Sequence, residues 1–166
     1  MSSYVMRARR FVEQIYPFVS DCHTVEQYRE AVNNFNTVYH RKVMVCHGQT
    51  RVVLVTSDYV VKIDYGHMAK RWGGCADEVR QYCLAFNKGY SYLFARITPY
   101  MYNECVFYIM PRIDDIDGER NQDEDVYMFL RGDENDFLND HLADLHCANY
   151  GWKDNYPVII DYACGY

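Results

Sequence analysis

Apolar residues recur at the spacing of a helix in the first part of the chain. Over residues 3–17 they fall on one face and leave arginines on the other, which predicts an amphipathic helix that Pro17 ends. Thr24 and Gln27 then form a capping-box pattern, and the apolar spacing continues to Phe35. We therefore expect two short helices at the N-terminus.

From residue 37 the spacing changes to that of strands. β-Branched and aromatic residues dominate four segments separated by turn residues, namely 37–39, 42–46, 51–56 and 59–64. A helix is predicted over residues 76–87, with an apolar face of Val79, Tyr82, Cys83 and Phe86. Two further strands are predicted over residues 92–100 and 105–110, and Pro111 ends the second because it has no N–H to donate.

The last third of the chain is predicted to be a helix followed by a hairpin. Asp133 is the candidate N-cap of a helix whose apolar face has Phe137, Leu138, His141, Leu142 and Leu145. Residues 150–152 and 156–160 are two short strands around a turn. Strands with one packed helix, followed by a mainly helical end, predict an α+β fold.

Composition indicates a folded protein. The 166 residues are 49% hydrophobic and 16% aromatic, which allows a sizeable core and excludes a disordered chain. No apolar run approaches the roughly 20 residues that cross a bilayer, and no apolar stretch follows the first arginines, so we expect a cytoplasmic protein without a membrane partner. The seven cysteines are scattered singly, which favours reduced thiols over a disulfide framework.

The negative charge is concentrated in one segment. Residues 114–136 contain ten acidic residues and two arginines, a net charge of −8, which leaves +2 for the rest of a chain whose total is −6. Such a segment is either a solvated loop or a surface for a basic partner. A DNA mimic would need acidic groups spread at phosphate-like spacing, whereas here they fall mostly in one segment. We therefore do not expect a role connected with nucleic acid.

The strongest chemical signal lies near the C-terminus. Asp144 is followed five residues later by Asn149, and Asp161 comes twelve residues after that, directly behind an apolar run at 158–160. These residue types can orient a hydroxyl group and hold Mg²⁺ against a triphosphate, because Mg²⁺ prefers oxygen ligands. The alternative is the end of a helix followed by a surface hairpin.

The pattern D-L-H-x-x-N followed by a hairpin and Asp161, read with the order of the strands before it, resembles the protein-kinase-like fold. The nearest kinds are compact phage serine/threonine kinases and the aminoglycoside and choline phosphotransferases. The resemblance implies a helical extension at residues 1–36, an antiparallel sheet with one packed helix at 37–110, and a much reduced second lobe with a catalytic-type loop at 111–166.

The resemblance also implies roles for individual residues. Lys62 would contact the phosphates of ATP in catalysis, and Glu78 would pair with Lys62, with Asp77 as the alternative. Asp144 would accept the proton of the substrate hydroxyl. The remaining residues of the implied nucleotide site are Gly48 in the phosphate loop, Met110 before the hinge, and Asn149 and Asp161, which would also hold Mg²⁺.

Several positions depart from the family pattern. Gly48 is the only glycine in the expected phosphate loop, and Leu142 replaces the His or Tyr usually found two residues before the catalytic Asp. The place of the D-F-G motif is taken by the sequence D-Y-A-C-G at residues 161–165. Pro111 removes one N–H from the expected hinge. Because the sequence ends at Tyr166, we expect the large substrate-presenting lobe to be absent.

Two functions follow from these features. We favour a phosphotransferase that uses Mg²⁺ and ATP, a small viral serine/threonine kinase that acts on host proteins in the host cytosol. The alternative is a weak or inactive kinase-like viral protein that binds and inhibits a host protein through its acidic surface.

Overall fold

The computed structural model describes residues 3–48, 50–65, 74–113, 128–142, 149–154 and 156–161. The helices are α1 (Ser3–Val19), α2 (Val25–Tyr39), α4 (Cys75–Lys88) and α6 (Gly132–His141), with a 3-10 helix η1 (Ser91–Leu93). The strands are β1 (Met44–His47), β2 (Arg51–Val55), β3 (Tyr59–Asp64), β4 (Thr98–Tyr102), β5 (Cys105–Pro111), β6 (Tyr150–Lys153) and β7 (Tyr156–Ile159). The predicted α+β class is confirmed.

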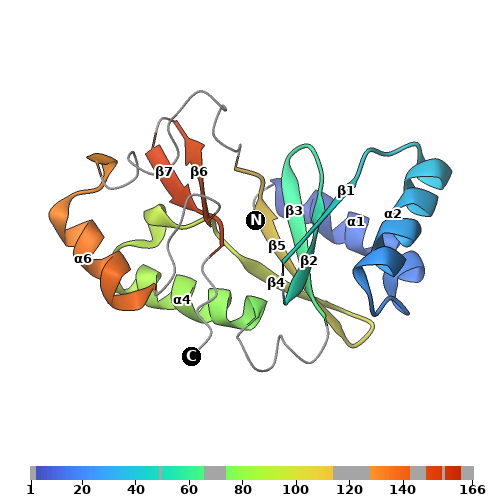
Figure 1. Cartoon of the computed structure of the whole chain (residues 1–166), viewed down its shortest axis with the longest axis horizontal. Helices are drawn as coiled ribbons and strands as arrows, with labels where there is room; N and C mark the ends of the chain where they lie inside the picture. The colour runs from blue at the N-terminus through green and yellow to red at the C-terminus, as the bar shows by residue number, and fades with distance from the viewer. Residues whose placement is uncertain are drawn as a thin grey trace.

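The centre of the molecule is a five-stranded antiparallel sheet in the order β1-β2-β3-β5-β4 (Figure 1). Its chain order of three strands, one helix and two strands is the one predicted for a minimal kinase-like fold. Strands β6 and β7 form a separate hairpin. The N–H of Ala95 donates to the carbonyl of Ile159 at 2.8 Å, which ties this hairpin to the segment after η1.

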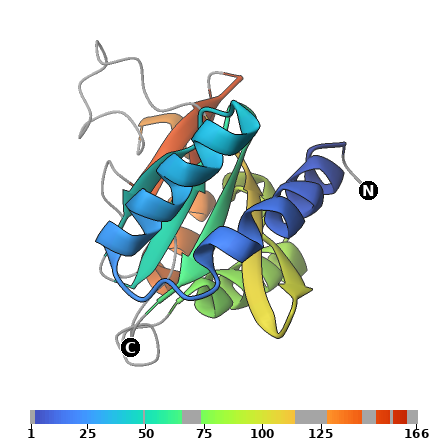
Figure 2. The same ribbon diagram turned by 90° about the vertical axis from the view of Figure 1, so that its right-hand side faces the viewer.

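Two apolar cores cover the opposite faces of the sheet. Helices α1 and α2 lie against one face, as Figure 2 shows, where Ile15 and Phe35 pack with Leu54 and Ile109 of the strands. On the other face, helix α4, helix α6 and the β6–β7 hairpin enclose a second core that includes Met110. Because side chains alternate along a strand, Lys62 lies on the face opposite to Val61, away from α1 and α2.

The N-terminal helices are longer than predicted. Helix α1 continues through Pro17 to Val19, whose buried side chain extends the apolar stripe of the helix. The prediction of a strand at residues 37–39 was wrong, since α2 continues to Tyr39. Tyr39 stacks on the ring of Phe35 at 4.8 Å, so side-chain packing outweighs the strand propensity of this segment.

Three other predictions need correction. Residues 92–97 are not a strand, because η1 and an irregular segment precede β4. Phe86 was assigned to the apolar face of its helix, but it is 66% exposed, and the inward face of α4 has Cys75, Glu78 and Ala85 instead. Helix α6 begins before Asp133, with Arg131 as its N-cap, because the carboxylate of Glu134 accepts the N–H of Arg131.

Candidate functional site

Lys62 is the central cation of the site. It lies on β3, is 4% exposed, and its ammonium donates to both carboxylate oxygens of Glu78 at 2.7 and 2.9 Å. A third hydrogen bond, at 2.8 Å, goes to the carbonyl of Ile160 at the end of the β6–β7 hairpin. The ammonium therefore connects strand β3, helix α4 and the C-terminal hairpin.

Helix α4 delivers Glu78 to Lys62 because its first turn is held by the end of β3. The carboxylate of Asp64 accepts the N–H of Cys75 at 3.0 and 3.2 Å, which supplies the cap that Gly74 lacks. A Cβ at Gly74 would lie 2.7 Å from Asp64, so a glycine is needed for this close approach. Asp77, the alternative partner of Lys62, instead forms an ion pair with Arg80 on the same helix.

Arg51 is a second buried cation that the sequence analysis missed. One terminal nitrogen of its guanidinium donates to Glu78 at 2.8 Å, and the other lies 3.3 Å from Asp161. Burial opposes the charge of Arg51, but the adjacent Glu78 and Asp161 carboxylates outweigh that effect and raise its pKa. Burial also raises the pKa of Glu78, and the neighbouring Lys62 and Arg51 cations oppose that shift.

The strand register explains why Arg51 belongs to the site. Val53 on β2 pairs with Lys62 on β3, and Arg51 pairs with Asp64. Because every second residue of a strand points to the same face, Arg51 and Lys62 both lie on the cleft side of the sheet. The alternation of side chains along β2 and β3 could have placed Arg51 and Lys62 on one face each. Only the pairing register shows that this is the same face and that the two side chains become neighbours.

Asn149 and Asp161 lie together at the ends of the hairpin. The backbone carbonyl of Asn149 accepts the N–H of Ile160 at 2.7 Å and the N–H of Asp161 at 3.1 Å. The side chain of Asp161 is 44% exposed and can be reached from solvent. Asp144 lies outside the described residues. Leu142 is buried.

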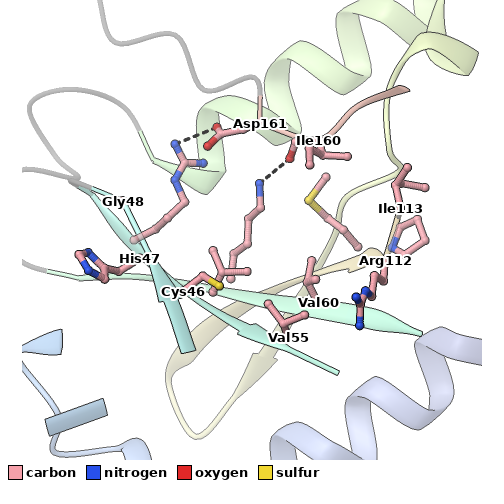
Figure 3. Close-up of a pocket in the computed structure, with 14 residues that line it drawn as sticks. Cys46, His47, Gly48, Val55, Val60, Arg112, Ile113, Ile160 and Asp161 are labelled. Carbon is pink, nitrogen blue, oxygen red and sulfur yellow. Dashed lines mark hydrogen bonds and ion pairs between the residues drawn. The ribbon is translucent and has the colours of Figure 1, made fainter. Parts of the chain in front are cut away.

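The described side chains enclose a cavity of about 420 Å³ between the sheet and the hairpin (Figure 3). Its apolar lining consists of Val53, Val55, Val60, Met110, Pro111, Ile113 and Ile160. Figure 3 shows His47 and Gly48 at one end and Arg112 and Ile113 at the other, with Asp161 across from Val55. The cavity therefore has an apolar slot and an end where charged groups meet.

The predicted hinge lies at the end where Met110, Pro111 and Ile113 give an apolar lining and Arg112 also borders the cavity. Met110 is 1% exposed and lines the cavity beside Pro111. The N–H of Arg112 donates to the carbonyl of Asp58 at 3.1 Å, so this strand pairing continues one residue past Pro111. Because carbonyls alternate in direction along an antiparallel strand, the carbonyl of Pro111 points away from β3.

Two further observations concern the whole described part of the chain. Within the described ranges, no group of three or more His, Cys, Asp or Glu side chains is placed to hold a metal ion. In the same part of the chain, no helix has both the length and the apolar character needed to cross a bilayer. Residues 114–127, which contain most of the acidic segment, lie outside the described residues.

Comparisons with known proteins give one distant similarity. No protein-family model matches the sequence, and no curated protein matches it at a significant level. A solved structure of the Lpg2603 kinase of Legionella pneumophila, bound to IP6, is similar with 19% sequence identity and a TM-score of 0.47. The match covers 74% of this chain and 47% of that kinase, so the chain spans about half the length of the kinase. A similarity this distant assigns no function.

Proposed function

We propose that the chain binds ATP in the cavity between the sheet and the hairpin and transfers its terminal phosphoryl group. The observation that supports this most directly is the buried Lys62–Glu78 pair, 2.7 Å apart, at the charged end of a cavity of about 420 Å³. In phosphoryl transfer the protein acts chiefly by positioning and by stabilising negative charge. A fixed ammonium at the end of an apolar slot is suited to both tasks.

The residues present fit a nucleotide. The apolar side chains of Val55, Val60 and Met110 would enclose the base, and Lys62 would face the phosphates. Pro111 can still offer its carbonyl there, although it has no N–H. The lining is therefore divided in the same way as ATP, which has an aromatic base at one end and charged phosphates at the other.

The residues present also fit a Mg²⁺ ion bound together with phosphates. Asp161 and Asn149 would supply oxygen ligands, and Mg²⁺ is commonly held by one or two protein groups plus the phosphates of a substrate. When bound, the ion would neutralise phosphate charge. Asp144 is proposed to accept the proton of the substrate hydroxyl, as implied by its resemblance to the catalytic loop of kinases.

The finer parts of the proposal rest on the resemblance alone. They are that the acceptor is a Ser or Thr hydroxyl of a protein, that the chain is viral, and that it acts on host proteins in the host cytosol. The proposed division into residues 1–36, 37–110 and 111–166 also follows from the resemblance.

Two measurements test the phosphotransferase. The wild type, incubated with Mg²⁺ and γ-labelled ATP, should label a protein acceptor or itself, and Mg²⁺-ATP should raise its melting temperature. Asp161→Ala should abolish labelling, whereas Asp140→Ala, which removes an exposed carboxylate of α6, should not. A wild type that shows neither labelling nor a thermal shift contradicts the proposal.

A second candidate function is favoured by the contact between Arg51 and Asp161. A carboxylate 3.3 Å from a guanidinium already has a cationic partner, with which Mg²⁺ would have to compete. We therefore also consider a weak or inactive kinase-like protein that inhibits a host protein through its acidic segment. Charge reversal across residues 114–125 should then abolish capture of the partner in a pull-down, while Asp161→Ala should leave capture intact.

A further inference from the structure

We propose that Arg51 binds the phosphates of the nucleotide in place of the missing glycine-rich loop, and that it gives up its ion pair with Asp161 to do so. This inference rests on the proposed function, because it concerns the same cavity. It assigns a substrate-contacting role to a residue of β2 that the kinase resemblance does not include.

The contacts of Lys62 give the first reason. An ammonium has three N–H donors, and Lys62 makes three hydrogen bonds, two to Glu78 and one to the carbonyl of Ile160. Lys62 can therefore reach a phosphate only by breaking one of these bonds. As the site stands, all three donors of Lys62 are used, so it can act on a phosphate through its charge but offers no unused N–H.

The contacts of Arg51 give the second reason. Among the described residues, its five N–H donors meet two acceptor groups, one at each terminal nitrogen. The contact with Glu78, at 2.8 Å, anchors the guanidinium to a carboxylate that is fully buried. The contact with Asp161 is longer, at 3.3 Å, and its carboxylate is 44% exposed. Asp161 is therefore the partner that can be exchanged.

The loop beside Arg51 gives the third reason. Gly48 lines the same cavity, and its N–H donates to the carbonyl of Arg51 at 3.0 Å, which closes the turn between β1 and β2. A Cβ at Gly48 would meet no protein atom within 4 Å, so no contact within the described protein requires a glycine there. The side chain of Arg51 supplies planar donors that suit phosphate oxygens.

The charges of the site are consistent with such an exchange. Lys62 and Arg51 face Glu78 and Asp161, so two cations balance two carboxylates around the cavity. A phosphate chain that enters this end brings negative charge, and a cation bound to Asp161 would release the guanidinium. Arg51 would then face phosphate on one side and Glu78 on the other.

The test is the equilibrium binding of ATP and of adenosine, with Mg²⁺ and in its absence, to the wild type, Arg51→Gln and Arg51→Lys. Loss of a charge-assisted contact predicts that Arg51→Gln weakens ATP binding about tenfold or more under both conditions. The affinity of Arg51→Gln for adenosine should stay within about twofold of the wild-type value, because adenosine has no phosphate for Arg51 to contact. Arg51→Lys should restore part of the affinity for ATP.

A second variant separates phosphate binding from a simple restraint on Asp161. Asp161→Asn removes the ion pair but keeps Arg51, so it should bind Mg²⁺-free ATP more tightly than the wild type does. If Arg51 only restrains Asp161, Arg51→Gln will bind Mg²⁺-ATP at least as tightly as the wild type, which overturns this inference alone. A wild type that binds neither ATP nor adenosine overturns the proposed function as well.

Discussion

The ammonium of Lys62 lies 2.7 Å from a carboxylate oxygen of Glu78, and the same oxygen accepts a hydrogen bond from Arg51 at 2.8 Å. Glu78 has no exposed surface, so one buried anion is shared by two nearly buried cations. Removal of one partner from such a cluster leaves the opposite charge uncompensated in a poorly solvated place.

The first prediction concerns the order of stability among variants of this cluster. Glu78→Ala should lower the free energy of unfolding by about 3–5 kcal/mol, because both cations lose their shared anion. Lys62→Met should cost less, because Arg51 still pairs with Glu78. Asp77→Ala is the matched control on the same helix and should cost less than about 1 kcal/mol. Urea unfolding measures all three, and equal losses for Glu78→Ala and Asp77→Ala would contradict the predicted order.

The second prediction concerns the junction between β3 and α4. Gly74→Ala would place a Cβ 2.7 Å from Asp64 and push its carboxylate away from the N–H of Cys75. The loss of a helix cap predicts a destabilisation of about 0.5–2 kcal/mol. Gly48→Ala is the control, because its Cβ would meet nothing within 4 Å. Thermal unfolding compares the two, and equal melting temperatures would show that Asp64 does not cap α4.

The third prediction concerns acid stability and Glu134 on α6. Burial raises the pKa of Glu134, but donors from Tyr92, Tyr156 and the N–H of Arg131 outweigh it and lower the pKa to about 2 from 4.5. A carboxyl group with a lowered pKa in the folded state stabilises the fold above its unfolded pKa. This stabilisation is therefore complete above about pH 4.5 and is lost as the pH falls toward 2.

Glu134→Gln tests that assignment. The variant should be less stable than the wild type near neutral pH, and the difference in unfolding free energy should shrink as the pH falls from 4.5 to 2. Asp136→Asn, an exposed change on the same helix, should show a much smaller pH dependence. A difference that stays constant over this range would show that Glu134 is not held ionised by its donors. It would then be an ordinary buried polar group.

The fourth prediction concerns the apolar slot of the cavity. Val55→Phe adds a ring beside Val60 and Met110, where the base of a nucleotide would lie. We expect the affinity for both ATP and adenosine to fall by about tenfold or more, as measured by fluorescence titration. Val38→Phe, on an exposed part of α2, should bind as the wild type does. Unchanged binding by Val55→Phe would place the nucleotide elsewhere.

Local sequence was sufficient for several elements of the fold, and the kinase resemblance supplied part of the site. The capping box at Thr24 and the strand at residues 59–64 each depend on residues close in the chain. Lys62, on an apolar strand, and Glu78, near the start of the next helix, were named because the resemblance to the kinase-like fold implies them at these positions. Their roles in catalysis stay a prediction.

Other features depend on which faces meet in space. Periodicity places Val79, Tyr82 and Phe86 together on α4, but the side chain that turns toward the sheet is Glu78, because two buried cations attract it. Glu134 was counted with the acidic surface, but tyrosine hydroxyls from two distant segments enclose it. Such contacts join residues far apart in the sequence, so no local pattern contains them.

The sequence by itself determined the order of helices and strands and the residue types available for chemistry, because propensity and alternation act over a few residues. Only the tertiary structure decided that Arg51 joins Lys62 at Glu78 and that α1 and α2 cover the face away from the cavity. The physical reason is register. Pairing Arg51 with Asp64 sets which side chains of β2 and β3 become neighbours, and a shift of one residue would turn Arg51 to the opposite face.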